Sequence, residues 1–290
     1  MNFKNILTDP IFKILEESVN EIGLKSYIVG GFVRDLLIKK LDTKDIDIVV
    51  VGSGIELAKK VKNKLTKSSK IQIYKSYGTA MLKSKNLTLE FVGARKESYS
   101  IKSRNPEISF GTLNEDLERR DFTINSMAIS LNRENYGALI DPFKGIVDLK
   151  NQIIKTPLDP IKTFSDDPLR MLRALRFCSQ LNFKIEPNSL RAITQNSERI
   201  SIITNERIVI ELNKILESKK PSKGFIILDE TGLLEKIIPE LNQLKGVEEI
   251  EGKTHKENFF HTLEVVDNIS KQTNNLWLRW AALLHDIGKP

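Results

Sequence analysis

The segment Asp45–Val51 constrains the fold of this chain more than any other, because acidic residues alternate with β-branched ones at its start. In an extended strand, successive side chains point to opposite faces of the sheet. Asp45 and Asp47 therefore share one face, and Ile46 and Ile48 share the other. The pattern predicts a strand with one buried face and one face open to solvent or to a ligand.

The two aspartates of this strand predict a metal site. Two carboxylates about 7 Å apart on one face repel each other, and a divalent cation relieves that repulsion. Magnesium prefers one or two carboxylates together with substrate phosphates. We therefore expect Asp45 and Asp47 to hold Mg²⁺ beside a nucleotide. The alternative is a half-exposed strand whose two aspartates are only solvated.

A second alternating segment, Leu87–Val92, carries Glu90 on its polar face. If this strand neighbours the first, Glu90 is a third carboxylate of the same site. Three carboxylates with two metal ions suit in-line phosphoryl transfer. All the histidines lie after residue 254, so chemistry in the first 254 residues has carboxylates and metal ions as its natural acids and bases.

The first part of the chain mixes helical and strand periodicities, and the later part is helical. Helices are expected at 12–23, 32–40 and 56–65, and strands at 27–29, 45–51, 71–74, 79–83 and 87–92. The mixed pattern ends near Pro142. The sequence after it has helical periodicity, with breaks at Pro187 and around Thr204. No strand is expected after about Ile154. The fold class is therefore α+β, with one sheet followed by an all-helical remainder.

A glycine pair, Gly30-Gly31, lies between the expected strand at 27–29 and the helix that follows. Two glycines allow a ligand to approach the backbone closely, and a helix N-terminus offers free N–H groups to phosphate oxygens. Arg34, one turn further on, can add a bidentate contact. The alternative is a tight turn followed by an ordinary surface pair of Arg34 and Asp35.

Charge and composition point to an anionic partner and a reducing compartment. The net charge is +7, and the excess is concentrated between Lys162 and Lys223, which suits RNA or a solvated helical surface. The only cysteine, Cys178, excludes an internal disulfide and a cysteine-based zinc site. With no apolar run long enough for a membrane and no secretory signal, we expect a cytoplasmic protein without a membrane partner.

Six ordered motifs of this chain together resemble the class II family of CCA-adding tRNA nucleotidyltransferases and poly(A) polymerases, within the DNA polymerase beta nucleotidyltransferase superfamily. The motifs are Gly30–Asp35, Asp45–Asp47, Arg119–Asn125, Asp141–Gly145, Asp166–Phe177, and Asn205–Arg207 with Glu211. The resemblance implies a nucleotidyltransferase head with a mixed sheet and flanking helices. It also implies a helical neck that binds RNA.

The resemblance assigns further residues to the nucleotide. The Arg119–Asn125 motif implies that Arg120, Asp121 and Asn125 hold the ribose and phosphates, alongside Gly30, Gly31 and Arg34. Asp167 and Arg170 match the pair that hydrogen bonds to the incoming base, and Arg173 and Arg176 match arginines that approach the nucleotide. Asp166 stands where the family usually has glutamate, so we assign it no role. Asp167 is equally suited to cap a helix that begins at Pro168.

The C-terminal segment Trp280–Pro290, with His261 upstream, resembles the start of an HD phosphohydrolase domain. In that family a histidine, a His-Asp pair and a later aspartate bind divalent metals, and the first three match His261, His285 and Asp286. The chain reaches Pro290 before the later aspartate, so we expect a truncated chain with an incomplete site and no HD activity. The alternative is a helix with capping and core histidines.

The family resemblance implies that the chain adds CCA to the 3′ end of tRNA from CTP and ATP by a two-metal mechanism. The expected domains are a catalytic head at 1–150, a neck at 151–240 and the start of an HD domain at 241–290. A poly(A) polymerase or a CC- or A-adding enzyme would carry the same head motifs. An idle RNA-binding scaffold and an HD metal hydrolase are the alternatives of another class. The sequence leaves the oligomeric state open.

Overall fold

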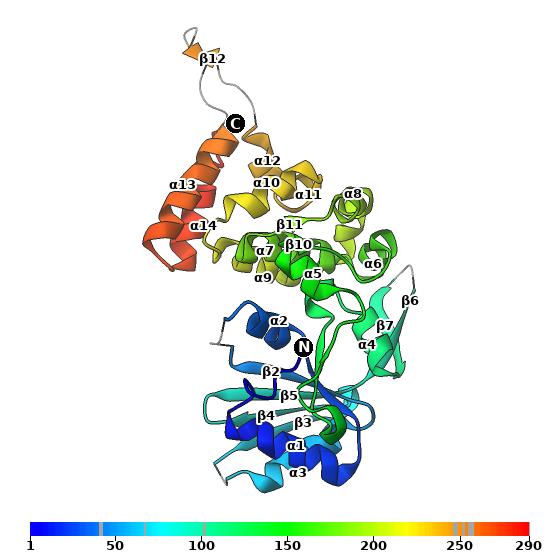
Figure 1. The fold of residues 1–290 in the computed structure, drawn as a ribbon. Coiled ribbons are helices and arrows are strands. Elements are labelled where there is room, and N and C mark those ends of the chain that lie inside the picture. The colour runs from blue at the N-terminus through cyan, green and yellow to red at the C-terminus, as the bar shows by residue number, and fades with distance from the viewer. Residues whose placement is uncertain are drawn as a thin grey trace. The chain divides into compact units, whose positions relative to one another are not determined.

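The computed structural model describes residues 1–40, 43–66, 68–100, 103–245, 249–250, 253–254 and 258–289, and it mixes helices and strands as expected (Figure 1). The chain forms two compact units. The first comprises Met1–Ser98 and Pro106–Asn151, and the second comprises Tyr99–Asn105 and Gln152–Pro290. The backbone therefore enters the second unit briefly and returns to the first before its final crossing. The predicted division of the helical part at residue 240 stays a prediction.

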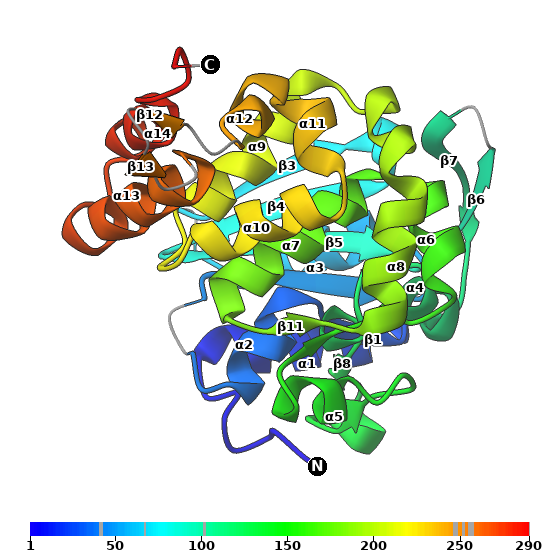
Figure 2. The same ribbon diagram turned by 90° about the horizontal axis from the view of Figure 1, so that it is seen from above.

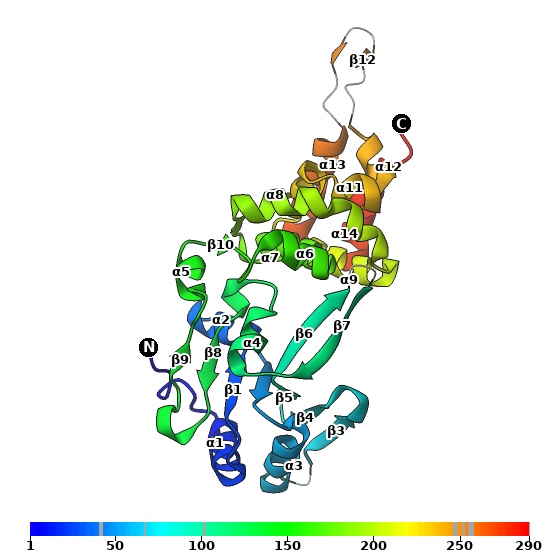
Figure 3. The same cartoon turned by 90° about the vertical axis from the view of Figure 1, so that its right-hand side faces the viewer.

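The first unit is built on a seven-stranded mixed sheet, as the family resemblance implied. Figure 3 shows β1, β8 and β9 side by side at one end of it. Strands β2 and β5 run parallel, and the other neighbours are antiparallel. In spatial order the strands are β3 (Lys70–Tyr74), β4 (Thr79–Ser84), β5 (Leu87–Gly93), β2 (Asp45–Val50), β1 (Ser26–Val29), β8 (Ala128–Ser130) and β9 (Leu139–Ile140).

Helices α1 (Pro10–Ile22) and α3 (Gly54–Lys64) pack against each other and lie together on one side of the sheet (Figure 1). Helix α1 begins after Asp9, whose side chain accepts from the Ile11 N–H, and it ends at Gly23 in the left-handed conformation. The remaining short elements are α2 (Gly31–Leu37), α4 (Leu113–Glu118), α5 (Gly145–Lys150), η1 (Lys75–Tyr77), η2 (Thr123–Asn125) and η3 (Arg133–Asn135).

A separate two-stranded sheet of β6 (Arg95–Ser100) and β7 (Ser103–Phe110) was not anticipated from the sequence. Its residues are mostly polar and charged, and Pro106 lies within β7. Proline within a run counts against a strand when only the sequence is read. This sheet supplies Glu97, whose role in the first unit is described below.

The second unit is helical. The breaks expected at Pro187 and Thr204 are confirmed, because α8 begins at Pro187 and Thr204 is the N-cap of α9. Figure 2 shows α7 and α10 packed side by side. The elements are α6 (Pro160–Asp166), α7 (Leu169–Leu181), α8 (Pro187–Asn196), η4 (Ser197–Ile202), α9 (Asn205–Leu216), α10 (Ser222–Glu230), α11 (Leu233–Ile237), α12 (Pro239–Gln243), α13 (Asn258–Gln272) and α14 (Leu276–Leu284).

The expectation that no strand follows Ile154 was wrong. Strand β10 (Ile153–Ile154) pairs in parallel with β11 (Lys184–Ile185), and β12 (Glu249–Ile250) pairs with β13 (Lys253–Thr254). Each of these strands has two residues, which is too short for any hydrophobic periodicity to be read. Within the described parts of the chain, no helix is long and apolar enough to cross a membrane.

Candidate functional site

The two acidic strands are neighbours, as predicted. Strands β2 and β5 pair in parallel, with Asp47 directly opposite Glu90 and Asp45 opposite Thr88. Ile46 and Ile48 are buried on the other face, and Leu57 of α3 is buried on that side as well. The alternation read from the sequence thus places the three carboxylates on one face of the sheet.

The pKa values of Asp47 and Glu90 are both raised above those of solvated carboxylates. Burial raises the pKa of Asp47, and the nearby Asp45 raises it further, while Arg120 opposes both. Burial also raises the pKa of Glu90, with the Asp47 charge as the next cause. Both groups are thus less readily ionised than a solvated carboxylate. Burial removes them partly from water, and their negative charges repel each other. A bound cation would relieve this repulsion, so the donor set fits a divalent metal.

Gly30 opens space beside these carboxylates. Its φ of +75° lies in the region that favours glycine. A Cβ atom placed there would lie 3.1 Å from Nη1 of Arg120 and 3.1 Å from Oδ2 of Asp47. One placed on Gly31 would lie 3.5 Å from Nη2 of Arg34. The missing side chain of Gly30 therefore leaves a narrow gap, tight even for a methyl group, between the Arg120 guanidinium and the Asp47 carboxylate.

Replacing Gly30 with alanine is expected to weaken nucleotide binding more than it weakens the fold. The positive φ costs about 1–3 kcal/mol of stability, and the added methyl group pushes Arg120 and Asp47 apart. Gly23→Ala is the matched control, since Gly23 has a φ of +68° and nothing within 4 Å of its ideal Cβ position. Thermal unfolding should show similar losses for the two variants, whereas the KM for nucleotide should rise only for Gly30→Ala. An equal KM in both variants would contradict this account of the gap.

Arg34, Asn125 and Asp121, which the sequence analysis assigned to the nucleotide, belong to one hydrogen-bonded group. Arg34 donates through Nη1 to Oδ1 of Asn125 at 2.9 Å, and Asn125 donates to Oδ1 of Asp121 at 3.0 Å. Asp35 forms a 2.7 Å ion pair with Arg34 and accepts from Thr43. Asp35 is therefore more than the partner in a surface pair, because it is buried and fixes the Arg34 guanidinium.

In the second unit, the residues expected to select the base lie just before helix α7 and in its first turn. The helix begins at Leu169 with Pro168 as its N-cap, one residue later than predicted, and Oδ1 of Asp167 accepts from the Leu169 N–H at 3.2 Å. Arg170 lies against Tyr99, with Nη2 3.4 Å from the hydroxyl and the guanidinium 5.9 Å from the ring centre. Arg173 lies over the Phe177 ring at 5.6 Å. Tyr99 was not identified from the sequence, since nothing in its segment signals a contact with α7.

Arg176 is only 6% exposed and is bound to a carboxylate. Its Nη1 donates to both oxygens of Glu211 on α9, at 2.8 and 3.1 Å, and its guanidinium lies 4.3 Å from the centre of the Phe177 ring. The structure thus places Arg176 in a buried ion pair that fastens α7 to α9. Such a pair supports the helix that presents Asp167 and Arg170.

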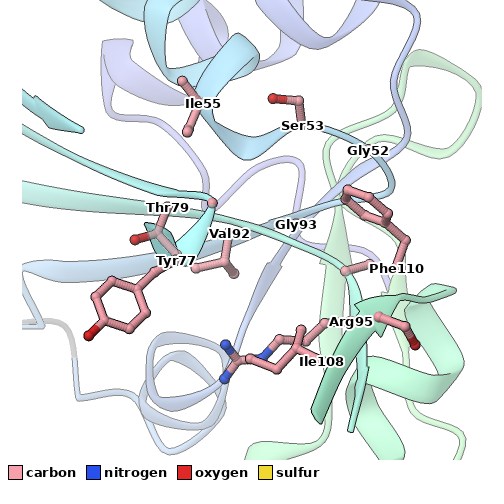
Figure 4. Close-up of a pocket in the computed structure, with 13 residues that line it drawn as sticks. Gly52, Ser53, Ile55, Tyr77, Thr79, Val92, Gly93, Arg95, Ile108 and Phe110 are labelled. Atoms are coloured by element: carbon pink, nitrogen blue, oxygen red, sulfur yellow. The ribbon is translucent and has the colours of Figure 1, made fainter. Parts of the chain in front are cut away.

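A cavity of about 280 Å³ lies elsewhere on the first unit, beyond the carboxyl ends of β2 and β5 (Figure 4). Its walls include Gly52, Gly93, Arg95, Tyr77 and Phe110. None of the residues assigned from the sequence lines it. Arg95 in its wall is nevertheless close enough to Glu90 for its charge to oppose the rise in the pKa of that carboxyl.

The histidines expected to resemble an HD site do come together. Ligand atoms of His261 on α13 and of His285 and Asp286 after α14 lie within 4.8 Å of one another. Nε2 of His285 is 3.3 Å from Oδ1 of Asp286, and Lys289 binds the other oxygen at 2.8 Å. Three convergent donors fit a metal ion only in part, because the lysine competes for the single carboxylate.

Comparisons with known proteins agree with this geometry. Residues 26–155 match the poly(A) polymerase head domain, and residues 182–245 match the model described as the probable RNA and SrmB-binding site of polymerase A. The chain is 40% identical to an A-adding tRNA nucleotidyltransferase of Aquifex aeolicus, over 71% of the chain and 26% of that protein. It is 35% identical to a CCA-adding enzyme of Anoxybacillus flavithermus, over 93% of the chain and 62% of that enzyme.

Among solved structures, a tRNA nucleotidyltransferase complexed with a primer tRNA and an incoming ATP analogue superposes with a TM-score of 0.75 at 33% identity. The match covers 94% of this chain and 75% of the other. The chain spans less than two thirds of the length of the two curated relatives above. The shared motifs, the matched head and the structural likeness show that the chain belongs to the family of tRNA nucleotidyltransferases built on a poly(A) polymerase head.

Proposed function

We propose that this chain transfers nucleotides from CTP and ATP to the 3′ end of tRNA, adding the sequence CCA. The observation that carries the proposal is the register of β2 and β5, which sets Asp47 opposite Glu90 and beside the gap at Gly30. Relatives named for CCA addition or A addition support the same reaction. The absence of a candidate histidine in the head agrees with chemistry that depends on metal ions.

Asp45 and Asp47 would hold Mg²⁺ in a two-metal site, with Glu90 as the third carboxylate. Bound magnesium supplies a lowered pKa for the attacking 3′ hydroxyl and neutralises charge on the leaving pyrophosphate. Arg34 and Arg120 bind the triphosphate from either side of the two glycines. Asp121 and Asn125 bind the ribose, because their polar atoms already form one group with Arg34.

At the start of α7, Asp167 and Arg170 would form the hydrogen bonds to the base. One carboxylate oxygen of Asp167 accepts from the helix N-terminus, and the other would accept from an amino group of cytosine or adenine. Arg170 is the donor of the pair, and Arg173 approaches the nucleotide from one turn further along. We assign Arg176 a supporting role, since Glu211 already occupies its guanidinium.

Incorporation of labelled nucleotides into tRNA lacking its 3′ CCA tests the proposal, with Mg²⁺ and with CTP alone, ATP alone, or both. Addition of C, C and a single A is the expected result. A lengthening A tail would instead identify a poly(A) polymerase, and incorporation of one nucleotide type would identify a CC- or A-adding enzyme. No incorporation, despite protection from heat by nucleotide and Mg²⁺, would favour an RNA-binding scaffold.

Replacing Arg170 with alanine is expected to blur the choice of base. Without the guanidinium, CTP and ATP lose a directional hydrogen bond that UTP and GTP do not make, so discrimination should fall by about 10-fold or more. Competition between CTP and UTP at fixed tRNA measures the effect. Arg191→Ala, at an exposed position on α8, is the control and should leave selectivity unchanged. Unchanged selectivity in the Arg170 variant would remove this residue from base recognition.

We expect no HD phosphohydrolase activity from the present chain, because Lys289 already pairs with the carboxylate of Asp286 in the group that it forms with His261 and His285. Turnover of a phosphomonoester or a cyclic nucleotide by the purified chain would contradict this. We place the protein in the cytoplasm, where tRNA and reduced thiols occur; the buried free Cys178 is compatible with that compartment.

A further inference from the structure

Asp116 on α4 is a completely buried carboxylate that binds two consecutive arginines. Its Oδ1 accepts from Nε and Nη2 of Arg119 at 3.0 and 2.6 Å. Its Oδ2 accepts from Nε and Nη2 of Arg120 at 3.3 and 3.0 Å. Each oxygen thus grips one guanidinium by two nitrogens, an arrangement that fixes direction as well as charge.

Apart from Asp116, the two arginines contact different residues. Arg119 donates through Nη1 to Glu97 of β6 at 3.0 Å, and Glu97 also forms an ion pair with Arg95. Nη1 of Arg120 instead points to the gap at Gly30. Oδ2 of Asp47 borders the same gap on its other side. Only one of the two arginines therefore reaches the proposed triphosphate position, although both share one anchor.

The charge of Asp116 is well compensated. Burial by itself raises the pKa of this carboxyl, but Arg120 and then Arg119 outweigh burial and bring the pKa below its ordinary value. A buried carboxylate without such partners would be costly. Helix α4 has its own N-terminal capping box of Thr112 and Glu115, so Asp116 is not needed to cap the helix.

We propose that Asp116 is a positioning residue for nucleotidyl transfer, which aims Nη1 of Arg120 at the triphosphate and keeps this guanidinium from pairing with Asp47. This inference rests on the proposed function and deepens it. Without Asp116, Arg120 would swing toward Asp47, which lies across the gap at Gly30 and already interacts with its charge. The nucleotide and its metal would then have to displace an internal ion pair before binding.

A double-mutant cycle tests this role, with Asp116→Asn, Arg120→Ala and the double variant compared with the unchanged chain. Asp116→Asn should raise the KM for CTP by about 10-fold or more, with a smaller change in kcat. In the Arg120→Ala background the same change should add less than about twofold, because the residue that Asp116 positions is gone. Glu118→Gln on the same helix is the matched control and should behave like the unchanged chain, since the Glu118 side chain accepts a hydrogen bond from Asn114 and borders neither arginine's contacts with Asp116 among the described residues.

Additive effects of Asp116→Asn and Arg120→Ala on KM would overturn the proposal and leave Asp116 a purely structural role. If Asp116→Asn does not fold, Arg119→Ala gives the second test, since it removes the other partner and leaves the bond between Asp116 and Arg120. It should lower the melting temperature while raising KM much less than Arg120→Ala does. If Arg119→Ala and Arg120→Ala raise the KM for CTP equally, the proposal that only Arg120 reaches the triphosphate is wrong.

Dissociation constants for CTP, measured in the same variants by protection from heat, keep this test separate from the proposed function. An unchanged chain that binds CTP but incorporates none would contradict the proposed reaction. The coupling between Asp116 and Arg120 could still be measured in that case from the CTP dissociation constants of the variants. Binding without coupling would contradict the positioning role.

Discussion

Replacing Asp47 with asparagine is expected to abolish nucleotide incorporation and, at the same time, to stabilise the protein in the absence of metal. Loss of the carboxylate that we propose binds Mg²⁺ should lower kcat by about 10³-fold or more. The variant is expected to be more stable because the pKa of Asp47 is raised in the folded protein, and burial is the main cause of the rise. A carboxyl with a raised pKa lowers stability as the pH rises through its ordinary value, and the full penalty remains above the raised value.

Differential scanning at neutral pH, without divalent ions, should show a melting temperature about 2–4 °C higher for Asp47→Asn, which corresponds to about 1 kcal/mol. Near pH 3, below the ordinary pKa of aspartate, the difference should vanish because both proteins then carry a neutral group. Asp45→Asn is the matched comparison, since Asp45 lies at the exposed end of β2 and should gain less. Mg²⁺ with CTP should protect the unchanged chain more than Asp47→Asn. Retained turnover in this variant would refute the metal assignment.

Replacing Glu211 with alanine should cause the largest loss of stability in the second unit. Arg176 would remain buried with a positive charge and without its carboxylate, which typically costs about 3–5 kcal/mol. The melting temperature of this unit should fall by about 10 °C. Glu217→Ala on the exposed end of the same helix is the control and should change stability by about 0.5 kcal/mol or less.

A double variant separates the ion pair from nucleotide binding. Arg176→Met with Glu211→Leu removes both charges and keeps similar volume, so much of the lost stability should return. If Arg176 only fastens α7 to α9, this variant should keep its selectivity for CTP and ATP. Selectivity lost in a stable double variant would show that Arg176 contacts the nucleotide after all.

The position of the acidic face was predictable because period-2 alternation states which residues share a side. Asp45, Asp47 and Glu90 could be grouped once the strand at 87–92 was assumed to neighbour the first. Their pairing register, with Asp47 opposite Glu90, could not be read from the sequence, since it depends on the crossover through α3, β3 and β4. The glycine pair was visible, but one of the two side chains that border its gap belongs to Arg120, ninety residues away.

The buried ion pairs were harder to predict. Arg176 carries the same residue type and helical spacing as Arg170 and Arg173, so only the tertiary position of Glu211 on α9 separates its role from theirs. Asp116 lies in an unremarkable charged stretch, and its importance arises from complete burial. The two-residue strands β10 and β11 exist because distant segments meet, and no local pattern encodes them.

The brief entry of Tyr99–Asn105 into the second unit means that the two halves of this protein cannot be separated by a single cut. Cleavage after Asn151 would leave the first unit still bearing Tyr99, which could no longer make its contact with Arg170. A first unit expressed alone would therefore carry a stretch that belongs to the second unit. The two halves are interlaced along the chain, and each must be synthesised in part before the other is complete.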